Sequence, residues 1–181
     1  HSSTSKVIAD SRIDHVLFTG SVSGGIEVKK AIGTRFIGAG LELGGKDPAY
    51  VRSDCNFDHA VENLVDGSYY NSGQSCCGIE RIYVDEKIFD NFVDAFKAQT
   101  EKYILDNPLD NSTNLGPVVK LSAANNIRDQ VSKALNNGAK NIIDESKFKI
   151  DNSDNCYVSP SALINVDHSM EFMMEETFGP T

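Results

Sequence analysis

The sequence predicts an α/β fold with a mostly parallel sheet and flanking helices, and two observations support this. Short apolar runs typical of buried strands alternate along the 181-residue chain with segments whose apolar residues recur at helical spacing. These helical segments, at roughly 12–17 residues, are long enough to connect parallel strands. No repeat period appears along the chain.

The first strand and helix are expected near the amino-terminal end. Residues 14–18, Asp-His-Val-Leu-Phe, form the strand and lead into Thr-Gly-Ser. The helix that follows runs to about Ile32, where Gly33 ends it. Residues 35–43 are a second strand candidate, closed by a pair of glycines.

A helix is expected from Phe57 to Tyr69, because apolar residues there fall at steps of three and four. Asp54 or Asn56 can cap its amino-terminal end. The turn-prone tetrapeptide 71–74, Asn-Ser-Gly-Gln, follows it. Further helices are expected over 88–103 and 121–135, and further strands at 49–51, 82–84, 142–143 and 162–164.

The composition is that of an ordinary soluble globular protein, with 40% hydrophobic and 24% charged residues. A formal net charge of −9 argues against nucleic-acid binding, which needs a basic face. No apolar run is long enough to span a membrane. Four cysteines are too few for a disulfide-built scaffold, so a reducing compartment, the cytoplasm, is expected. The spacing of His15, His59 and His168 suggests no metal site.

Four short motifs follow one another along the chain: FTGS at 18–21, LELGGK at 41–46, GQSCC at 73–77 and EETFGP at 175–180. Each alone has an ordinary structural explanation, such as a turn glycine or a cysteine packed as a small apolar residue. In this order and spacing, however, they resemble the signature of the aldehyde dehydrogenase superfamily. The similarity extends from about 14 to 180 and implies the fold of that family.

This resemblance implies NAD(P)-dependent oxidation of an aldehyde to a carboxylic acid, with Cys76 as the nucleophile. Cys76 matches the cysteine of the family's GQ-x-C motif. A thiolate suits the reaction because it attacks a carbonyl readily and can leave again. The neighbouring Cys77 is expected to point elsewhere and to pack.

By the same resemblance, Glu42 is the general base that activates water to hydrolyse the thioester, best with its pKa raised by burial. Gly44 and Gly45 next to it permit close approach of the backbone to a cofactor. The backbone of Leu43 is expected near the nicotinamide amide.

The remaining cofactor contacts are implied at both ends of the chain. Gly20 and Ser21 stand where a strand passes into a helix, which presents N–H groups to a phosphate. Gly20 and Gly25 match the family's Gly-x-x-x-x-Gly pattern. Glu176 matches the residue that hydrogen-bonds the nicotinamide ribose, and Phe178 matches the aromatic residue beside the nicotinamide ring. The resemblance therefore implies NAD or NADP as the cofactor.

The resemblance also implies a domain organisation. Residues 1–43 correspond to the end of the nucleotide-binding domain, and 44–181 to the catalytic thiol domain, truncated at its carboxyl-terminal end. The chain is expected to be an internal piece of a longer protein that forms homo-oligomers. Alone it is expected to bind cofactor poorly and to turn over negligibly, because an oxyanion-stabilising asparagine and a ribose-binding lysine lie upstream.

Three other interpretations remain. In a CoA-acylating relative a thiol collects the acyl group instead of water, but such relatives typically lack the base at the Glu42 position. A non-catalytic or degenerate paralogue would use the same scaffold without turnover. A thiol redox or metal module built on the Cys76-Cys77 pair lacks supporting ligands.

Tyr69 and Tyr70 either border the substrate tunnel or belong to the core.

Overall fold

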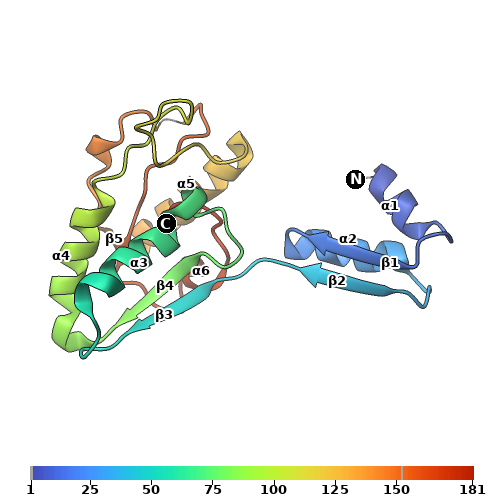
Figure 1. Cartoon of the computed structure of the whole chain (residues 1–181), viewed down its shortest axis with the longest axis horizontal. Helices are drawn as coiled ribbons and strands as arrows, with labels where there is room; N and C mark the ends of the chain where they lie inside the picture. The colour runs from blue at the N-terminus through green and yellow to red at the C-terminus, as the bar shows by residue number, and fades with distance from the viewer. Residues whose placement is uncertain (1, 152) are drawn as a thin grey trace. The chain divides into compact units, whose positions relative to one another are not determined.

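The structure is a computed structural model that describes residues 2–151 and 153–181. The chain divides into two compact units, which we call unit 1 (His1–Gly45) and unit 2 (Lys46–Thr181), each described by itself (Figure 1). The sequence places a domain boundary after Leu43, whereas the contacts divide the chain after Gly45. Which domain of an enzyme each unit represents stays a prediction.

Unit 1 is a parallel pair of strands covered by helices. The strands pair in register from His15 opposite Gly38 to Thr19 opposite Glu42. The helix between them ends at Gly33, as predicted, because this glycine adopts a positive φ of 58°. The elements of unit 1 are α1 (Ser2–Ala9), β1 (His15–Thr19), α2 (Val22–Ile32) and β2 (Gly38–Glu42).

Helix α1 is an element that the sequence patterns did not predict. Its serine-rich sequence has only moderate helix propensity. Ile8 is nevertheless buried in one cluster with Val28 and Ile32 of α2. Packing against α2, rather than local propensity, therefore accounts for this helix.

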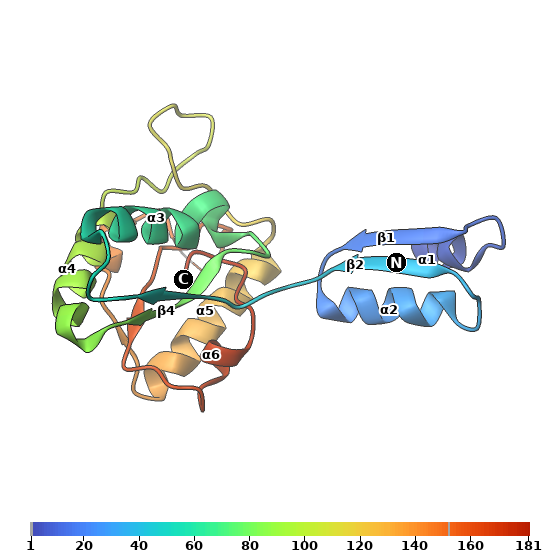
Figure 2. The same ribbon diagram turned by 60° about the horizontal axis from the view of Figure 1, so that its bottom comes forward.

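Unit 2 is built around a second parallel pair, β3 and β4. Helix α3 lies on one side of this pair, and α5 and α6 lie on the other (Figure 2). The helices and strands of unit 2 are β3 (Asp47–Val51), α3 (Phe57–Tyr69), β4 (Ile79–Val84), α4 (Phe89–Thr100), α5 (Leu121–Asn136), β5 (Lys140–Asn141), β6 (Leu163–Ile164) and α6 (Glu171–Met174). The described residues of unit 2 also form the short 3-10 helices η1 (Tyr70–Gly73), η2 (Glu86–Ile88) and η3 (Glu145–Lys147).

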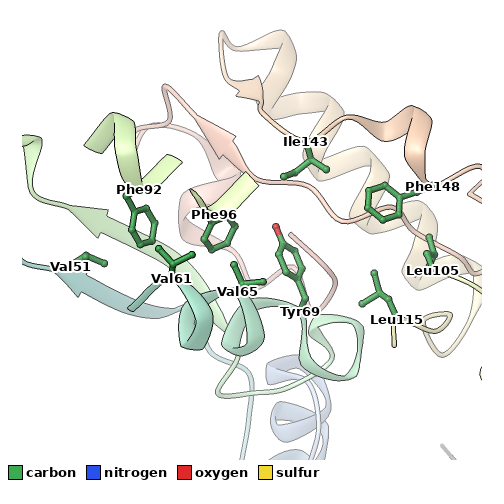
Figure 3. Close-up of a cluster of buried hydrophobic side chains, with 10 residues drawn as sticks. All are labelled: Val51, Val61, Val65, Tyr69, Phe92, Phe96, Leu105, Leu115, Ile143 and Phe148. Carbon is green, nitrogen blue, oxygen red and sulfur yellow. The ribbon is translucent and has the colours of Figure 1, made fainter. Parts of the chain in front are cut away.

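The core of unit 2 lies between α3 and α4. Val61, Val65 and Tyr69 point from α3 towards Phe92 and Phe96 of α4 (Figure 3). The start of α3 is fixed by Asn56, whose side chain accepts a hydrogen bond from the N–H of His59, so the second of the two predicted caps is correct. This packing holds the carboxyl-terminal end of α3, from which the GQSCC motif follows.

The sequence predicts a mostly parallel sheet. Among the described residues the strands form three separate two-stranded sheets, and two of these are parallel. The third, β5 with β6, is antiparallel. The strand expected at 142–143 lies earlier, at Lys140–Asn141, because it pairs with Leu163–Ile164. Among the described residues, no helix has both the length and the apolar character needed to cross a membrane.

Candidate active site

The GQSCC motif begins at Gly73, the last residue of η1, and the backbone of this loop is not helical at Asn71 and Ser72. Asn71, Ser72 and Gly73 have φ values of 53°, 57° and 69°, all in the left-handed region. Two of these three are not glycine: asparagine tolerates this region, but serine enters it rarely and needs its surroundings to hold it there. The loop therefore needs strong external contacts.

Gln74 and Ser72 supply those contacts. The Gln74 side chain donates to the carbonyl of Asn71 at 3.1 Å and accepts from the N–H of Val119 at 2.8 Å. The Ser72 hydroxyl donates to the carbonyl of Gly116 at 2.7 Å. The glutamine of the motif thus ties the loop to the segment before α5.

Cys76 and Cys77 occupy the two central positions of a tight turn, which the N–H of Gly78 closes by donating to the carbonyl of Ser75 at 3.1 Å. Both thiols are unbonded and exposed. The expectation that Cys77 packs is therefore wrong: its Sγ lies 3.3 Å from the Ser75 hydroxyl at the surface. The turn presents Cys76 to solvent on a braced loop.

The structure brings the GQSCC and EETFGP motifs into direct contact. A Cβ built on Gly73 would lie 1.9 Å from the carbonyl oxygen of Gly179. A Cβ on Gly179 would in turn lie 2.4 Å from the side chain of Ile127 in α5. Only glycines allow this approach, which places the backbone before Cys76 against the backbone after Phe178.

The backbone of the EETFGP motif is bound through several polar groups. The N–H groups of Thr177 and Phe178 both donate to the carboxylate of Glu80, at 2.9 Å each. The side-chain amide of Gln130 donates to the carbonyl of Glu176 at 3.2 Å. Phe178 adopts a φ of 53°, yet its side chain remains 40% exposed. Glu176 is half-buried.

A buried ion pair contacts the backbone of the EETFGP motif. Lys46, directly before β3, and Glu80, the second residue of β4, pair at 2.7 Å with side chains only 7% and 4% exposed. Burial lowers the pKa of the Lys46 ammonium, and the Glu80 carboxylate acts in the opposite direction. Sequence reasoning missed both residues as site residues. The available signals were the lysine at the end of LELGGK and a charged residue inside an apolar strand.

The predicted site residues of unit 1 gather where β1 and β2 end. The N–H of Gly20 donates to the carbonyl of Glu42 at 3.0 Å. A Cβ on Gly25 would lie 2.9 Å from the side chain of Leu43, so this glycine allows α2 to approach the end of β2. The Ser21 hydroxyl caps α2 by accepting from the N–H of Gly24. The Glu42 side chain is exposed within unit 1.

The predicted residues thus form two groups, one in each unit. Unit 1 holds Gly20, Ser21, Gly25, Glu42 and Leu43, and unit 2 holds Cys76, Glu176 and Phe178. Because Glu42 and Cys76 belong to different units, their pairing stays a prediction.

The two adjacent tyrosines differ sharply. Tyr69 is 1% exposed and donates its hydroxyl hydrogen to the carbonyl of Ser161 at 2.9 Å, so it belongs to the core. Tyr70 is 70% exposed. Of these two, Tyr70 is the only one whose side chain is accessible in unit 2.

Each unit, taken by itself, has donors and acceptors that fit one part of a dinucleotide cofactor. The amino-terminal end of α2 offers backbone N–H groups and a positive dipole end to a phosphate, beside Gly20 and Gly25. A carboxylate at Glu176 suits ribose hydroxyls, and the exposed ring of Phe178 suits a flat aromatic group. In the part of the chain that the structure describes, no three His, Cys, Asp or Glu side chains gather as metal ligands would.

The amino-acid sequence of this chain matches a family model and the sequences of known proteins. The family model described as "Aldehyde dehydrogenase family" matches residues 1–181. Aldehyde dehydrogenase 1A1 of Oryctolagus cuniculus is 36% identical over 169 residues, which cover 93% of this chain and 34% of that protein.

Solved structures agree with this match. Betaine aldehyde dehydrogenase from Staphylococcus aureus, in complex with NAD+, is similar with a TM-score of 0.88 and 31% identity, over 98% of this chain and 35% of that one. NADP-dependent glyceraldehyde-3-phosphate dehydrogenase from Bacillus halodurans, complexed with NADP, has a TM-score of 0.87 and 29% identity, over 98% and 35%. The chain spans about one third of the length of these relatives. On the match over all its residues, the chain belongs to the aldehyde dehydrogenase family.

Proposed function

We propose that the protein containing this chain oxidises an aldehyde to a carboxylic acid with NAD or NADP, and that Cys76 is its nucleophile. The observation that supports this most directly is the backbone contact between Gly73 and Gly179. It joins the loop that presents Cys76 to the segment that presents Glu176 and Phe178. A thiol and two groups suited to a nicotinamide nucleoside thereby belong to segments of unit 2 that contact each other.

The chemistry begins at the Cys76 sulfur. As a thiolate it attacks the aldehyde carbon and forms a thiohemiacetal, whose oxyanion requires hydrogen-bond donors. NAD or NADP, when bound, would supply the acceptor for the hydride that this carbon gives up. The product on Cys76 is a thioester, which must be hydrolysed to release the acid.

Glu42 is the proposed general base of that hydrolysis. A carboxylate takes a proton from water as the water attacks the thioester carbon, and the Cys76 sulfur leaves. Within unit 1 its backbone is fixed at the end of β2, because its carbonyl accepts from the N–H of Gly20, and its side chain is exposed, which leaves the carboxylate accessible to water. Leu43 follows it and packs against Gly25.

Cofactor binding is proposed on both units. Gly20, Ser21 and Gly25 would contact the phosphates at the start of α2. Glu176 would accept hydrogen bonds from the nicotinamide ribose, and Phe178 would lie beside the nicotinamide ring. We also propose that the full-length protein is a cytoplasmic homo-oligomer, and that the 181-residue chain alone is essentially inactive.

The test uses the full-length protein in which this sequence occurs. A panel of aldehydes is assayed for formation of reduced cofactor, with wild type, Cys76→Ala and, as the matched control, Cys77→Ala. Both thiols are exposed and share one turn, but only the first is the proposed nucleophile. Loss of at least about 10³-fold in Cys76→Ala, with Cys77→Ala near wild type, supports the proposal. Equal losses, or none, would sink it.

A further inference from the structure

The two parallel strands of unit 2 carry an irregularity at Glu80. Asp47 pairs with Ile79, and the next residue, Pro48, pairs with Arg81, so that Glu80 is the extra residue of a bulge. Bulges re-aim a side chain, and they are uncommon between parallel strands. Pro48 has no N–H to contribute to the ladder at this point, which suits the interruption.

The bulge directs the Glu80 carboxylate into a cluster of donors. One oxygen accepts from the Lys46 ammonium at 2.7 Å and from the N–H of Thr177 at 2.9 Å. The other accepts from the N–H of Phe178 at 2.9 Å. A carboxylate that accepts from two successive N–H groups fixes the orientation of both peptide planes.

Lys46 extends the same cluster to two further elements. Its ammonium donates to the Thr177 hydroxyl at 3.0 Å, and that hydroxyl donates to the side-chain carbonyl of Gln130 in α5 at 2.9 Å. The ammonium also lies 4.7 Å from the ring centroid of Phe172 in α6. Every polar atom of Thr177 other than its carbonyl is therefore bound within this network.

A contribution to folding stability does not explain the buried ion pair of Lys46 and Glu80. A buried ion pair loses hydration on both partners, and replacing such a pair with apolar residues is often neutral or stabilising. What the pair does provide is a fixed conformation at Phe178, whose φ of 53° is rare for a bulky residue. The network holds the backbone of this segment while the Phe178 ring stays 40% exposed.

We propose that Lys46 and Glu80 are positioning residues for the coenzyme: their ion pair sets the backbone of 176–178 so that the Glu176 carboxylate and the Phe178 ring meet the nicotinamide nucleoside. This inference rests on the proposed function. It adds two residues to the site that touch neither the aldehyde nor the coenzyme and act through the segment they bind.

The decisive variant is Glu80→Gln in the full-length protein, because glutamine keeps the shape but removes the charge. In the coenzyme-free protein, hydrogen exchange at the Thr177 and Phe178 amides is expected to accelerate about tenfold. The Kd of NAD or NADP, measured by calorimetry, and its KM are both expected to rise about tenfold. The aldehyde KM at saturating coenzyme should change less than twofold.

Glu101→Gln is the matched control. Glu101 also pairs with a lysine, Lys147, and also accepts from a backbone N–H, that of Asp144, but it caps the carboxyl-terminal end of α4, and both of these partners lie outside the EETFGP motif. Removing the charge of Glu101 should leave the coenzyme Kd unchanged. A Glu80→Gln protein with faster amide exchange but unchanged coenzyme Kd would overturn the inference, and so would one with neither change.

If Glu80→Gln does not fold, Thr177→Val decides the question. Valine keeps the N–H bonded to Glu80 but removes the hydroxyl that joins Lys46 to Gln130. A coenzyme Kd raised about threefold supports the inference, and an unchanged Kd overturns it. The proposed function is tested separately: it fails if aldehyde oxidation persists in Cys76→Ala. That result would leave the coenzyme-binding measurements on Glu80→Gln valid.

Discussion

Gly73 and Gly179 meet backbone to backbone, so closely that a methyl group on the first would lie 1.9 Å from the carbonyl oxygen of the second. Gly73 also has a positive φ of 69°. Both constraints act on the loop that presents Cys76. The geometry of the candidate nucleophile thus depends on a residue with no chemistry of its own.

Gly73→Ala is expected to destabilise unit 2 by more than about 3 kcal/mol, because the added Cβ forces the two segments apart. Gly138→Ala is the control, since Gly138 also has a positive φ, of 100°, but nothing lies within 4 Å of its added Cβ. That change should cost only about 1–2 kcal/mol. Urea unfolding of the two variants measures the difference, and equal losses would show that the contact with Gly179 is unimportant.

Glu42→Gln in the full-length protein should separate the two halves of the proposed reaction. Attack by Cys76 and formation of the thioester do not need the base, so a burst of reduced cofactor is expected in rapid-mixing experiments. Steady turnover should fall by roughly 10²–10⁴-fold because hydrolysis slows. Trapped acyl-enzyme is detectable by mass spectrometry. Unchanged steady turnover would refute the role of Glu42.

Tyr69→Phe should cost about 1–2 kcal/mol of unfolding free energy, because it leaves the buried carbonyl of Ser161 without its hydroxyl donor. Burial raises the pKa of Tyr69 well above its ordinary value, so this hydroxyl stays protonated at any pH of interest. Tyr70→Phe, at a residue that is 70% exposed, should change stability by less than about 0.5 kcal/mol. Chemical denaturation of the two variants compares them directly, and a large effect at Tyr70 would contradict the assignment.

Glu101→Gln should lower stability at neutral pH and have little effect in acid. The Lys147 ammonium holds the pKa of Glu101 below its ordinary value. A carboxyl group whose pKa is lowered by folding contributes stability above its unfolded pKa, roughly 4.3, and loses it as the pH falls through the lower folded pKa. Urea midpoints at pH 7 and pH 3 test this. A difference between wild type and variant that persists undiminished at pH 3 would contradict the charge-based explanation.

Local signals predicted the local elements well. Asn56 before an apolar helical pattern marks the start of α3, and Gly33 after one marks the end of α2. Both act within a few residues along the chain, where capping physics is strong and direct. The four motifs in their order likewise predicted the family, and the family match over residues 1–181 confirmed that prediction.

The contacts that join the motifs were not readable from the sequence. Lys46 reaches Thr177 across 131 positions, and Glu80 reaches the same residue across 97. No periodicity encodes such a pairing, and the bulge that turns Glu80 inward has no signature in the string IERIYV. The predicted position of β5, at 142–143, was wrong for a similar reason. Antiparallel pairing with β6 places the strand at Lys140–Asn141, before the apolar pair on which the prediction relied.

The separation between Glu80 and Thr177 also has a consequence during protein synthesis. At roughly 5–20 residues per second, the ribosome adds Thr177 about 5–20 s after Glu80. Throughout that interval the Glu80 carboxylate lacks the two amide donors that it binds in the folded protein, and Gly73 lacks its partner. The loop of Cys76 therefore completes its folded surroundings late in translation, so the thiol reaches its braced form only near the end of this stretch of the chain.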